Sequence, residues 1–337
     1  MEEIRIGVIG TGRIGVEHIR RINTGLSGAR VTAVASSTPA RAGEVAARFA
    51  IPHAMEAETL IASPGVDAVM ITSPGASHEA YALACLRARK PVFCEKPLAM
   101  TAEACLSVVH AECAVGRRLI QLGFMRRFDQ HHLELRQLLA GGSLGRALMV
   151  HATHRNPNNA NFNDTMEIVD TAIHELDALP WLLGDPVVSC QALYGAAASC
   201  IAGQQHDPML LLLRTASGVL IDLEVFTHCQ YGFDISCEVV CEQGAAALPP
   251  STSVMLRRSF SRSVREYDIW QERYAAAFDR ELQHFIDGVR CGVISGPSAW
   301  DGYSASLASE ACLRSLESGQ WEPVIHPDRP SLYSLSS

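Results

Sequence analysis

The chain has 337 residues, of which 48% are hydrophobic and 19% are charged. This length predicts about two domains, and the composition supplies enough apolar surface for sizeable cores and argues against disorder. Lys and Arg number 28 against 36 Asp and Glu, and the net charge of −8 argues against a nucleic acid or an anionic membrane as partner, because either would bind a basic face.

The first third of the chain alternates short apolar runs with helical patterns. The runs predict strands at 4–9, 31–35, 68–72, 91–94 and 119–123, and the patterns between them predict helices at 14–22, 40–49, 78–88 and 101–115. Strands that alternate with helices are typical of a doubly wound parallel sheet. The expected fold class is α/β, with a doubly wound domain over residues 1–122.

The pattern changes after Gly123. Helices are expected at 130–140, 168–183, 274–289 and 304–318, a strand at 147–154, and a polar, Asn-rich loop at 156–163. Strand-like segments separated by turns fill 187–248, which indicates a largely antiparallel sheet. Residues 123–337 are therefore expected to form a second α/β domain with an open, mainly antiparallel sheet.

The 11 cysteines include no C-x-x-C pair, so zinc fingers and thioredoxin-like sites have no support and no metal site is expected. Their odd number fits free thiols in a reducing cytosol. The N-terminal sequence MEEIRIGVIG lacks the basic region of a signal peptide, and no apolar stretch is long enough to span a membrane. We therefore expect a cytoplasmic protein without a membrane partner.

Residues 10–15 read Gly-Thr-Gly-Arg-Ile-Gly, the G-x-G-x-x-G pattern of dinucleotide-binding turns. The pattern alone is weak, but here it follows a predicted strand and opens a predicted helix. Gly10 allows the tight turn, Gly12 lets the main chain approach a pyrophosphate, and Gly15 lets helix and strand pack closely. An ordinary glycine-rich turn is the alternative interpretation.

The end of the second predicted strand bears on the choice between NAD and NADP. An acidic residue about 20 residues past the glycines would bind the ribose 2′-hydroxyl of NAD. This chain has Ser36, Ser37 and Thr38 there, with Arg41 close by in sequence. Because no carboxylate repels a 2′-phosphate, the sequence predicts tolerance of NADP and leaves NAD open.

Lys96 stands just past a predicted parallel strand, within the sequence Cys-Glu-Lys-Pro-Leu. Doubly wound sheets bind their ligands at the carboxyl ends of the strands. A lysine at that place can hydrogen-bond a substrate hydroxyl and stabilise its developing negative charge. A surface lysine in a turn that starts a helix is the alternative interpretation.

Asp170 and His174 lie four residues apart in a predicted helix, so that they share one face. A histidine can exchange a proton near neutral pH, and a neighbouring carboxylate can orient it. Asp177 lies one turn further along, on nearly the same face. A solvated ion pair on an amphipathic helix is the alternative, and a metal pair lacks a third ligand at a sensible spacing.

Polar side chains also gather at the end of the strand predicted at 147–154. His154 and Asn156 can donate hydrogen bonds to a polyol and accept them, and Tyr231 can add a hydroxyl group. A turn cap is the alternative for the first two residues, and an aromatic side chain packed on the sheet is the alternative for Tyr231.

Taken together, these motifs resemble the Gfo/Idh/MocA oxidoreductase family. The resemblance extends over nearly the whole chain, through GTGRIG at 10–15, EKPLA at 95–99, GFMRRFD at 123–129 and DTAIHELD at 170–177. Within the family the likeness is closest to the bacterial inositol 2-dehydrogenases, through GFMRRFD, His-Arg-Asn at 154–156, Asp-x-x-x-His at 170–174 and CQYGFDISCEVV at 229–240.

The resemblance implies a catalytic set of Lys96, Asp170 and His174. It implies cofactor contacts by Gly10, Gly12, Arg13, Ile14, Gly15, Ser36, Ser37, Ser73, Pro74, His78, Glu95 and Lys96. It implies substrate contacts by Lys96, Arg126, His154, Asn156, Asp170, His174 and Tyr231. The first domain would be an NAD(P)-binding Rossmann domain, and the second would bind the substrate and form a homo-oligomer, a tetramer or a dimer, through its sheet. Two departures from the family pattern are Ser36 in place of the usual acid and Ser73-Pro74-Gly75 in place of Thr-Pro-Asn.

The predicted function is that of an NAD(P)-dependent oxidoreductase that acts on the CH–OH group of a cyclitol and converts myo-inositol to the 2-keto compound, inosose. A related aminocyclitol or a sugar, an aldose at C1 or a ketosugar, is an alternative substrate. A non-catalytic NAD(P)-binding regulatory protein is a second alternative, although it need not keep the three catalytic residues together. Biliverdin-reductase-like or dihydrodiol chemistry is a third, which predicts a less polar loop than that at 156–161.

Overall fold

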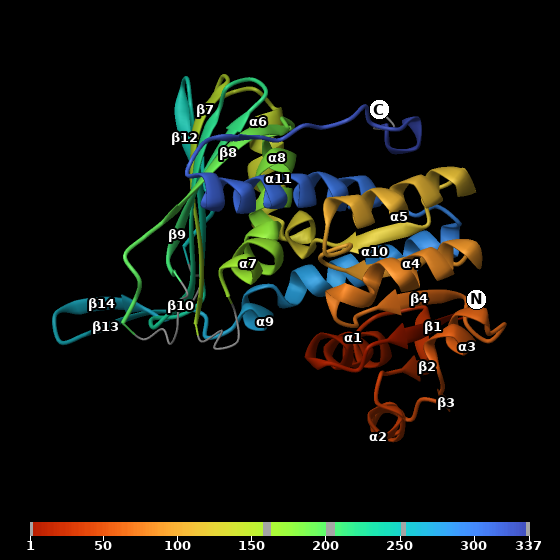
Figure 1. Ribbon diagram of the computed structural model, residues 1–337. Coiled ribbons are helices and arrows are strands. Elements are labelled where there is room, and N and C mark those ends of the chain that lie inside the picture. The colour runs from red at the N-terminus through yellow and green to blue at the C-terminus, as the bar shows by residue number, and fades with distance from the viewer. Residues whose placement is uncertain (1–2, 158–162, 200–205, 251–253, 335–337) are drawn as a thin grey trace. The chain divides into compact units, whose positions relative to one another are not determined.

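Figure 1 shows the computed structural model, which describes residues 3–157, 163–199, 206–250 and 254–334. The chain forms two compact units. The first comprises Met1–Met125, Ala276–Ser306 and Pro327–Ser337, and the second comprises Arg126–Ala275 and Leu307–His326. The boundary predicted after residue 122 stays a prediction, and the first unit also takes in segments from the C-terminal part of the chain.

The first unit contains a parallel sheet of six strands in the order β3-β2-β1-β4-β5-β6, as predicted for a doubly wound fold. The strands are β1 (Ile4–Ile9), β2 (Ala29–Ala35), β3 (His53–Ala54), β4 (Ala68–Ile71), β5 (Val92–Glu95) and β6 (Ile120–Gly123). All four residues of β4 are fully buried. Strands covered on both faces need no polar alternation, which explains their continuous apolar runs.

The helices of the first unit follow the strands, and the chain returns to this unit with a late helix. They are α1 (Arg13–Thr24), α2 (Pro39–Phe49), α3 (Ala57–Ala62), η1 (Gly75–Ser77), α4 (His78–Arg87), α5 (Ala102–Val115), α10 (Ala275–Cys291), the first residues of α11 (Ala299–Ser318), and η4 (Ser331–Tyr333). Phe285 and Ile286 of α10 belong to the same buried core as Ile6, Met70 and Phe93 of the sheet. Helix α10 is therefore part of the core of the first unit.

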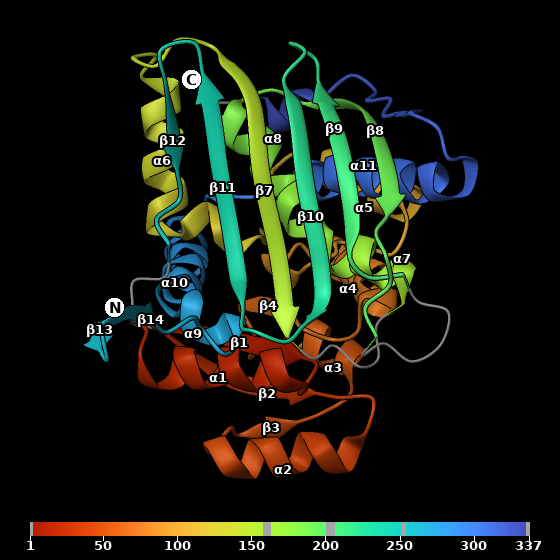
Figure 2. The same cartoon turned by 90° about the vertical axis from the view of Figure 1, so that its left-hand side faces the viewer.

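The second unit contains a sheet of seven strands in the order β12-β11-β7-β10-β9-β8-β15 (Figure 2). The strands are β7 (Ala147–Pro157), β8 (Val187–Tyr194), β9 (Met209–Thr215), β10 (Leu220–Cys229), β11 (Asp234–Cys241), β12 (Gly244–Ala247) and β15 (Glu322–Pro323). Strands β7 and β10 run parallel and the other neighbouring pairs that the structure describes run antiparallel. The prediction of a mainly antiparallel sheet is confirmed.

Helices cover one face of this sheet (Figure 2). The helices of the second unit are α6 (Gln130–Ala140), α8 (Ile173–Leu183) and the rest of α11 from Leu307, with the shorter segments η2 (Met125–Phe128), α7 (Asp164–Met166), η3 (Glu167–Ala172) and α9 (Trp270–Arg273). Along β10, buried residues alternate with half-exposed ones from Leu220 to Phe226. This period of two is what a sheet with one covered face requires. No helix in the described ranges is long and apolar enough to cross a membrane.

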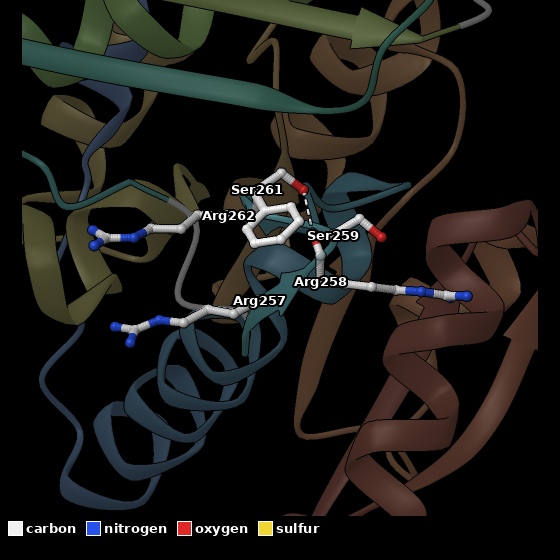
Figure 3. Close-up of a pocket in the computed structure, with 6 residues that line it drawn as sticks. Arg257, Arg258, Ser259, Ser261 and Arg262 are labelled. Atoms are coloured by element: carbon white, nitrogen blue, oxygen red, sulfur yellow. Dashed lines mark hydrogen bonds between the residues drawn. The ribbon is translucent and has the colours of Figure 1, made fainter.

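A short hairpin of β13 (Met255–Arg258) and β14 (Ser261–Val264) stands apart from both sheets. All its residues are exposed, and the side chains of Arg257, Arg258 and Arg262 line a shallow pocket at its tip (Figure 3). The hydroxyl of Ser261 donates a hydrogen bond of 2.7 Å to the main-chain oxygen of Arg258. No residue predicted for the functional site lines this pocket.

Candidate functional site

The glycine turn after β1 requires glycine at two of its three positions. Gly10 has a φ of +108°, and a Cβ atom there would collide with the main chain at Ser73. A Cβ atom on Gly15 would collide with the main-chain oxygen of Gly10. The hydroxyl of Thr72 donates a 2.7 Å hydrogen bond to this same oxygen, which ties the turn to the end of β4. At Gly10 and Gly15 the turn therefore packs directly against main-chain atoms and leaves no room for a side chain.

Gly12 differs from these two glycines because a Cβ atom there would meet no atom within 4 Å. It is the N-cap of α1, and no side chain caps the helix from this position. The first N–H groups of a helix are an anion-binding site when no side chain uses them, and the first turn carries no acidic residue. Arg13 and Ile14 follow at the start of α1 and are exposed and half-buried respectively. The open side of Gly12 therefore fits the pyrophosphate of a dinucleotide.

The residues at the end of β2 present hydroxyl groups and no carboxylate. Ser36 is half-buried directly after the strand, Ser37 and Thr38 are exposed, and Arg41 is exposed in the first turn of α2. The main-chain N–H of Thr38 donates to the hydroxyl of Ser36 at 3.4 Å. Hydroxyl groups and a guanidinium can donate hydrogen bonds to a 2′-phosphate, and the hydroxyl groups can also bind a 2′-hydroxyl.

His78 joins the two loops that follow β4 and β5. It is 1% exposed, and its ring nitrogens lie 2.7 Å from the main-chain oxygens of Pro97 and Ser73. The hydroxyl of Ser73 lies 2.7 Å from that of Ser77. His78 therefore holds the loop that carries Ser73 and Pro74 against the loop that carries Lys96. A direct contact of His78 with the cofactor stays a prediction.

Lys96 lies directly after β5, as predicted, and is half-buried. Its main-chain N–H donates to Oε2 of Glu95 at 3.3 Å. The other oxygen of Glu95 lies 2.7 Å from Nε2 of the fully buried His18. The Glu95 side chain thus points to His18 and holds the main chain at Lys96. His18 was missed by sequence reasoning, although it stands three residues after Gly15 on the same helix.

In the second unit, three of the predicted substrate residues lie close together around His154. The Nδ1 atom of His154 lies 2.8 Å from Oε2 of Glu175 and 3.2 Å from Nη2 of Arg126, and Arg126 and Glu175 form an ion pair. The His154 ring lies 6.2 Å from the ring of His174. Nδ2 of Asn156 lies 3.2 Å from Nε2 of His154. Arg126, His154, Asn156 and His174 therefore form one cluster within this unit.

Glu175 completes this cluster and was not predicted. It is 2% exposed, and burial alone would raise the pKa of its carboxyl. The charges of Arg126 and His154 outweigh burial and lower the pKa of Glu175 below its ordinary value. The signal was present in the motif DTAIHELD, where Glu175 follows His174 directly.

Asp170 and His174 do not lie in one regular α-helix. A π-helical segment, η3, covers Glu167–Ala172, and α8 starts at Ile173. The helix predicted at 168–183 is present, but its residues up to Ala172 form a π turn, which holds more residues than an α turn and shifts their faces. Asp170 is half-buried and His174 is 8% exposed. Asp177 is buried and forms an ion pair with the half-buried Arg127.

Asn156 and Tyr231 contribute polar atoms near the end of this sheet. The Oδ1 atom of Asn156 is buried and makes no hydrogen bond to a described residue. Tyr231 is 57% exposed, and its ring lies 5.8 Å from the guanidinium of Arg155. Arg155 itself pairs with Glu224 and Asp234. The polar loop predicted at 156–163 lies mostly outside the described residues.

A separate buried group in the second unit consists of Glu167, Asp207 and His228, whose ligand-type atoms lie within 4.8 Å of one another. Asp207 accepts hydrogen bonds from the main-chain N–H groups of Thr227 and His228, and its Oδ2 lies 2.8 Å from Nδ1 of His228. The hydroxyl of Thr227 lies 3.1 Å from oxygens of both carboxylates. Three distant segments meet here, so that no sequence spacing predicted the group.

Comparison with known proteins gives a consistent picture for both units. Residues 4–124 match the oxidoreductase family with an NAD-binding Rossmann fold, and residues 132–247 match the C-terminal domain of the GFO/IDH/MocA proteins. An inositol 2-dehydrogenase of Burkholderia cenocepacia is 46% identical over 333 residues, which cover 98% of this chain and 99% of that protein. One of Pseudomonas fluorescens is 47% identical over 334 residues, with the same coverage.

A solved structure extends this likeness to three dimensions. The crystal structure of myo-inositol dehydrogenase from Lactobacillus casei in complex with NAD(H) and myo-inositol superposes with a TM-score of 0.96 at 36% sequence identity. The match covers 98% of this chain and 99% of that one.

Proposed function

This chain belongs to the Gfo/Idh/MocA family of NAD-binding oxidoreductases, and we propose that it oxidises one secondary alcohol of a cyclitol, converting myo-inositol to 2-keto-inositol. The observation that carries this proposal is the similarity to inositol 2-dehydrogenases over 98% of the chain. The same chain keeps the glycine turn, Lys96, Asp170 and His174. A related aminocyclitol or sugar as substrate is the alternative outcome of the test below.

We assign the chemistry to three side chains. His174 accepts the proton of the substrate hydroxyl as general base, and Lys96 hydrogen-bonds the same oxygen and stabilises its developing charge. Asp170 orients the side chains of His174 and Lys96 and binds an adjacent hydroxyl of the substrate. NAD, when bound, supplies the acceptor for the hydride that leaves the alcohol carbon. The contribution of the chain is alignment and electrostatic stabilisation.

Recognition of a polyol falls to the cluster around His154. Asn156 offers the buried Oδ1 atom described above as an acceptor for a hydroxyl. Glu175 fixes Arg126 and His154 in place, because both lie against its carboxylate. Tyr231 adds a hydroxyl from the exposed loop after β10. A ligand with several hydroxyl groups suits such an array of donors and acceptors.

The test of this function measures NADH and NADPH formation by absorbance on a panel of inositols, aminocyclitols and sugars. We expect turnover with myo-inositol and a reduction of kcat by about 100-fold or more in His174→Ala, the loss typical of a missing general base. His110→Ala is the matched control, because His110 is an exposed histidine of α5 in the first unit. A near-normal kcat in a folded His174→Ala variant would remove His174 from the mechanism.

The cofactor choice is the subject of a separate measurement. NAD is the cofactor of the family, and we propose that Ser36 and its neighbours let this chain accept NADP as well. The ratio of kcat/KM for NAD and NADP measures this tolerance. A preference for NAD above about 100-fold, which corresponds to roughly 2.7 kcal/mol, would contradict it.

We further propose a homo-oligomer, a tetramer or a dimer, formed through the uncovered face of the seven-stranded sheet. A cytoplasmic location accords with the absence of a disulfide among the cysteines that the structure describes.

A further inference from the structure

Helix α10 carries a buried carboxyl on the face that enters the core of the first unit. The Phe278 ring lies 5.7 Å from the ring of His18 on α1, and the Phe285 ring lies 5.8 Å from that of Phe93 on β5. Glu281 lies three residues after Phe278 and four before Phe285, so that it shares their face. It is 0% exposed. Glu281 therefore lies between these two aromatic contacts, towards His18 and β5.

The carboxyl of Glu281 has no donor to satisfy it. Both of its side-chain oxygens are buried, and neither makes a hydrogen bond to a described residue. The amide of Gln121 donates to the main-chain oxygen of Glu281 at 3.0 Å, and Oε1 of Gln121 is itself a buried acceptor without a partner in the described part of the chain. An ionised carboxylate in this place would be unsatisfied, whereas a neutral acid offers the O–H donor that this group of acceptors needs.

Glu95 of β5 is the neighbouring carboxyl, and unlike Glu281 it has hydrogen-bond partners. It lies 2.7 Å from His18 and accepts the main-chain N–H of Lys96 at 3.3 Å. A Cβ atom on Gly123 would stand 3.1 Å from Oε2 of Glu95, so that the carboxylate is closely confined. Burial and the charge of Glu95 raise the pKa of Glu281 well above its ordinary value.

The other charged groups around Glu281 are engaged elsewhere. Arg21 of α1 lies over the Phe278 ring at 5.5 Å, and it pairs with Asp279 at 2.5 Å and with Glu17 at 3.0 Å. His18 of α1 pairs with Glu95 of β5. Among the charged groups on the elements that pack against α10, the carboxylate of Glu95 is thus the one that raises the pKa of Glu281.

We propose that Glu281 is a positioning residue that stays protonated, supplies a hydrogen-bond donor instead of a second negative charge beside Glu95, and so keeps Glu95 on His18 and on the main chain of Lys96. The consequence for turnover rests on the proposed function, in which Lys96 touches the substrate alcohol. Two adjacent buried carboxylates repel each other. Ionisation of Glu281 would push Glu95 away from its partners and release Lys96.

The protonation is tested without turnover, by urea unfolding at pH 5, 6.5 and 8. A carboxyl that is protonated in the fold and ionised in the unfolded chain loses its stabilising contribution as the pH rises above the unfolded value. The unfolding constant of the parent, relative to that of Glu281→Gln, should therefore rise by up to about tenfold per pH unit. Asp287→Asn, an exposed carboxyl on the same helix, is the matched control and should follow the parent.

Equal pH dependence in the parent and Glu281→Gln would overturn the proposal, because Glu281 would then be ionised in the fold. This result is independent of whether the protein oxidises a cyclitol, so that a failure of the proposed function remains distinguishable.

The positioning role is tested by two neutral variants of similar length. Glu281→Gln keeps a donor and should keep kcat and KM within about twofold of the parent at pH 7, whereas Glu281→Met lacks a donor and should lower kcat by about tenfold with little change in the KM for NAD. Circular dichroism establishes that both variants fold. Equal kcat values in the two variants would reduce Glu281 to a packing residue and overturn the positioning role.

Discussion

Glu175 and Glu281 show at the scale of single residues how partners decide the charge of a buried carboxyl. Both are at most 2% exposed. Glu175 lies against Arg126 and His154, which outweigh burial and lower the pKa of its carboxyl. Glu281 has only burial and the like charge of Glu95, which raise the pKa of its carboxyl. The same residue type is thus a charged anchor in one unit and a neutral acid in the other.

Replacement of Glu175 should lower the stability of the protein by an amount that can be estimated. Glu175→Gln leaves the buried guanidinium of Arg126 without its carboxylate and should destabilise the protein by about 3–5 kcal/mol. Because the folded pKa of Glu175 is lowered, its contribution is present above the unfolded value and is lost as the pH falls below it. The difference in the free energy of unfolding between Glu175→Gln and the parent, measured with urea, should therefore be largest near neutral pH and shrink towards pH 3.

Glu317→Gln, an exposed carboxyl on α11, is the control for this measurement and should change stability little. If the free energy of unfolding of Glu175→Gln differed from that of the parent by the same amount from pH 7 to pH 3, the lost contribution would be packing and not charge.

At the scale of elements, the strand-turn-helix of β1 and α1 combines two kinds of glycine. Gly10 and Gly15 are required by the protein itself, since a side chain at either would strike main chain. Gly12 is required only if a ligand comes close, since a side chain there would meet open space. The turn can therefore be tested for folding and for cofactor binding separately.

Gly12→Ala should keep the thermal stability of the parent and weaken NADH binding by about tenfold or more, because the added methyl group occupies space that the pyrophosphate needs. Gly15→Ala should instead destabilise the fold by about 1–3 kcal/mol, because α1 must move away from the turn. Fluorescence titration with NADH and thermal unfolding of both variants measure this. Parental NADH affinity in Gly12→Ala would place the pyrophosphate elsewhere.

At the scale of the whole molecule, the uncovered face of the seven-stranded sheet is the surface through which we propose that the chain assembles. Leu210 and Leu212 of β9 and Phe226 of β10 alternate with buried residues, so that they lie on the face away from the helices. Asp222 and Glu224 lie opposite the two leucines in the ladder. An apolar strip with polar neighbours is typical of interfaces between subunits.

The double variant Leu210→Arg/Leu212→Arg should convert the proposed oligomer to monomers, because two guanidinium groups would replace apolar contacts and would have to be desolvated at a closed interface, which costs several kcal/mol. Light scattering after size exclusion measures the mass. Leu138→Arg introduces the same change on an exposed leucine of the covering helix α6 and should leave the mass unchanged. An unchanged mass in the double variant would exclude this face as the interface.

The sequence by itself determined the alternation of strands and helices in the first unit, the glycine turn, and the place of Lys96 at the end of β5. These features depend on the spacing of residues close together in the chain, and that spacing can be read directly from the sequence. The likeness to the family over the whole chain then predicted Asp170, His174 and the residues around His154, and the comparisons support the same chemistry.

Only the tertiary structure decided which elements share a core and which buried groups meet. Sequence periodicity could not show that α10 joins the core of the first unit, or that η3 interrupts the helix predicted at 168–183. It could not pair Glu281 with Glu95, or Glu175 with Arg126, because these partners are far apart in the chain. Charge and protonation of a buried group depend on neighbours brought in by folding, and no local pattern records them.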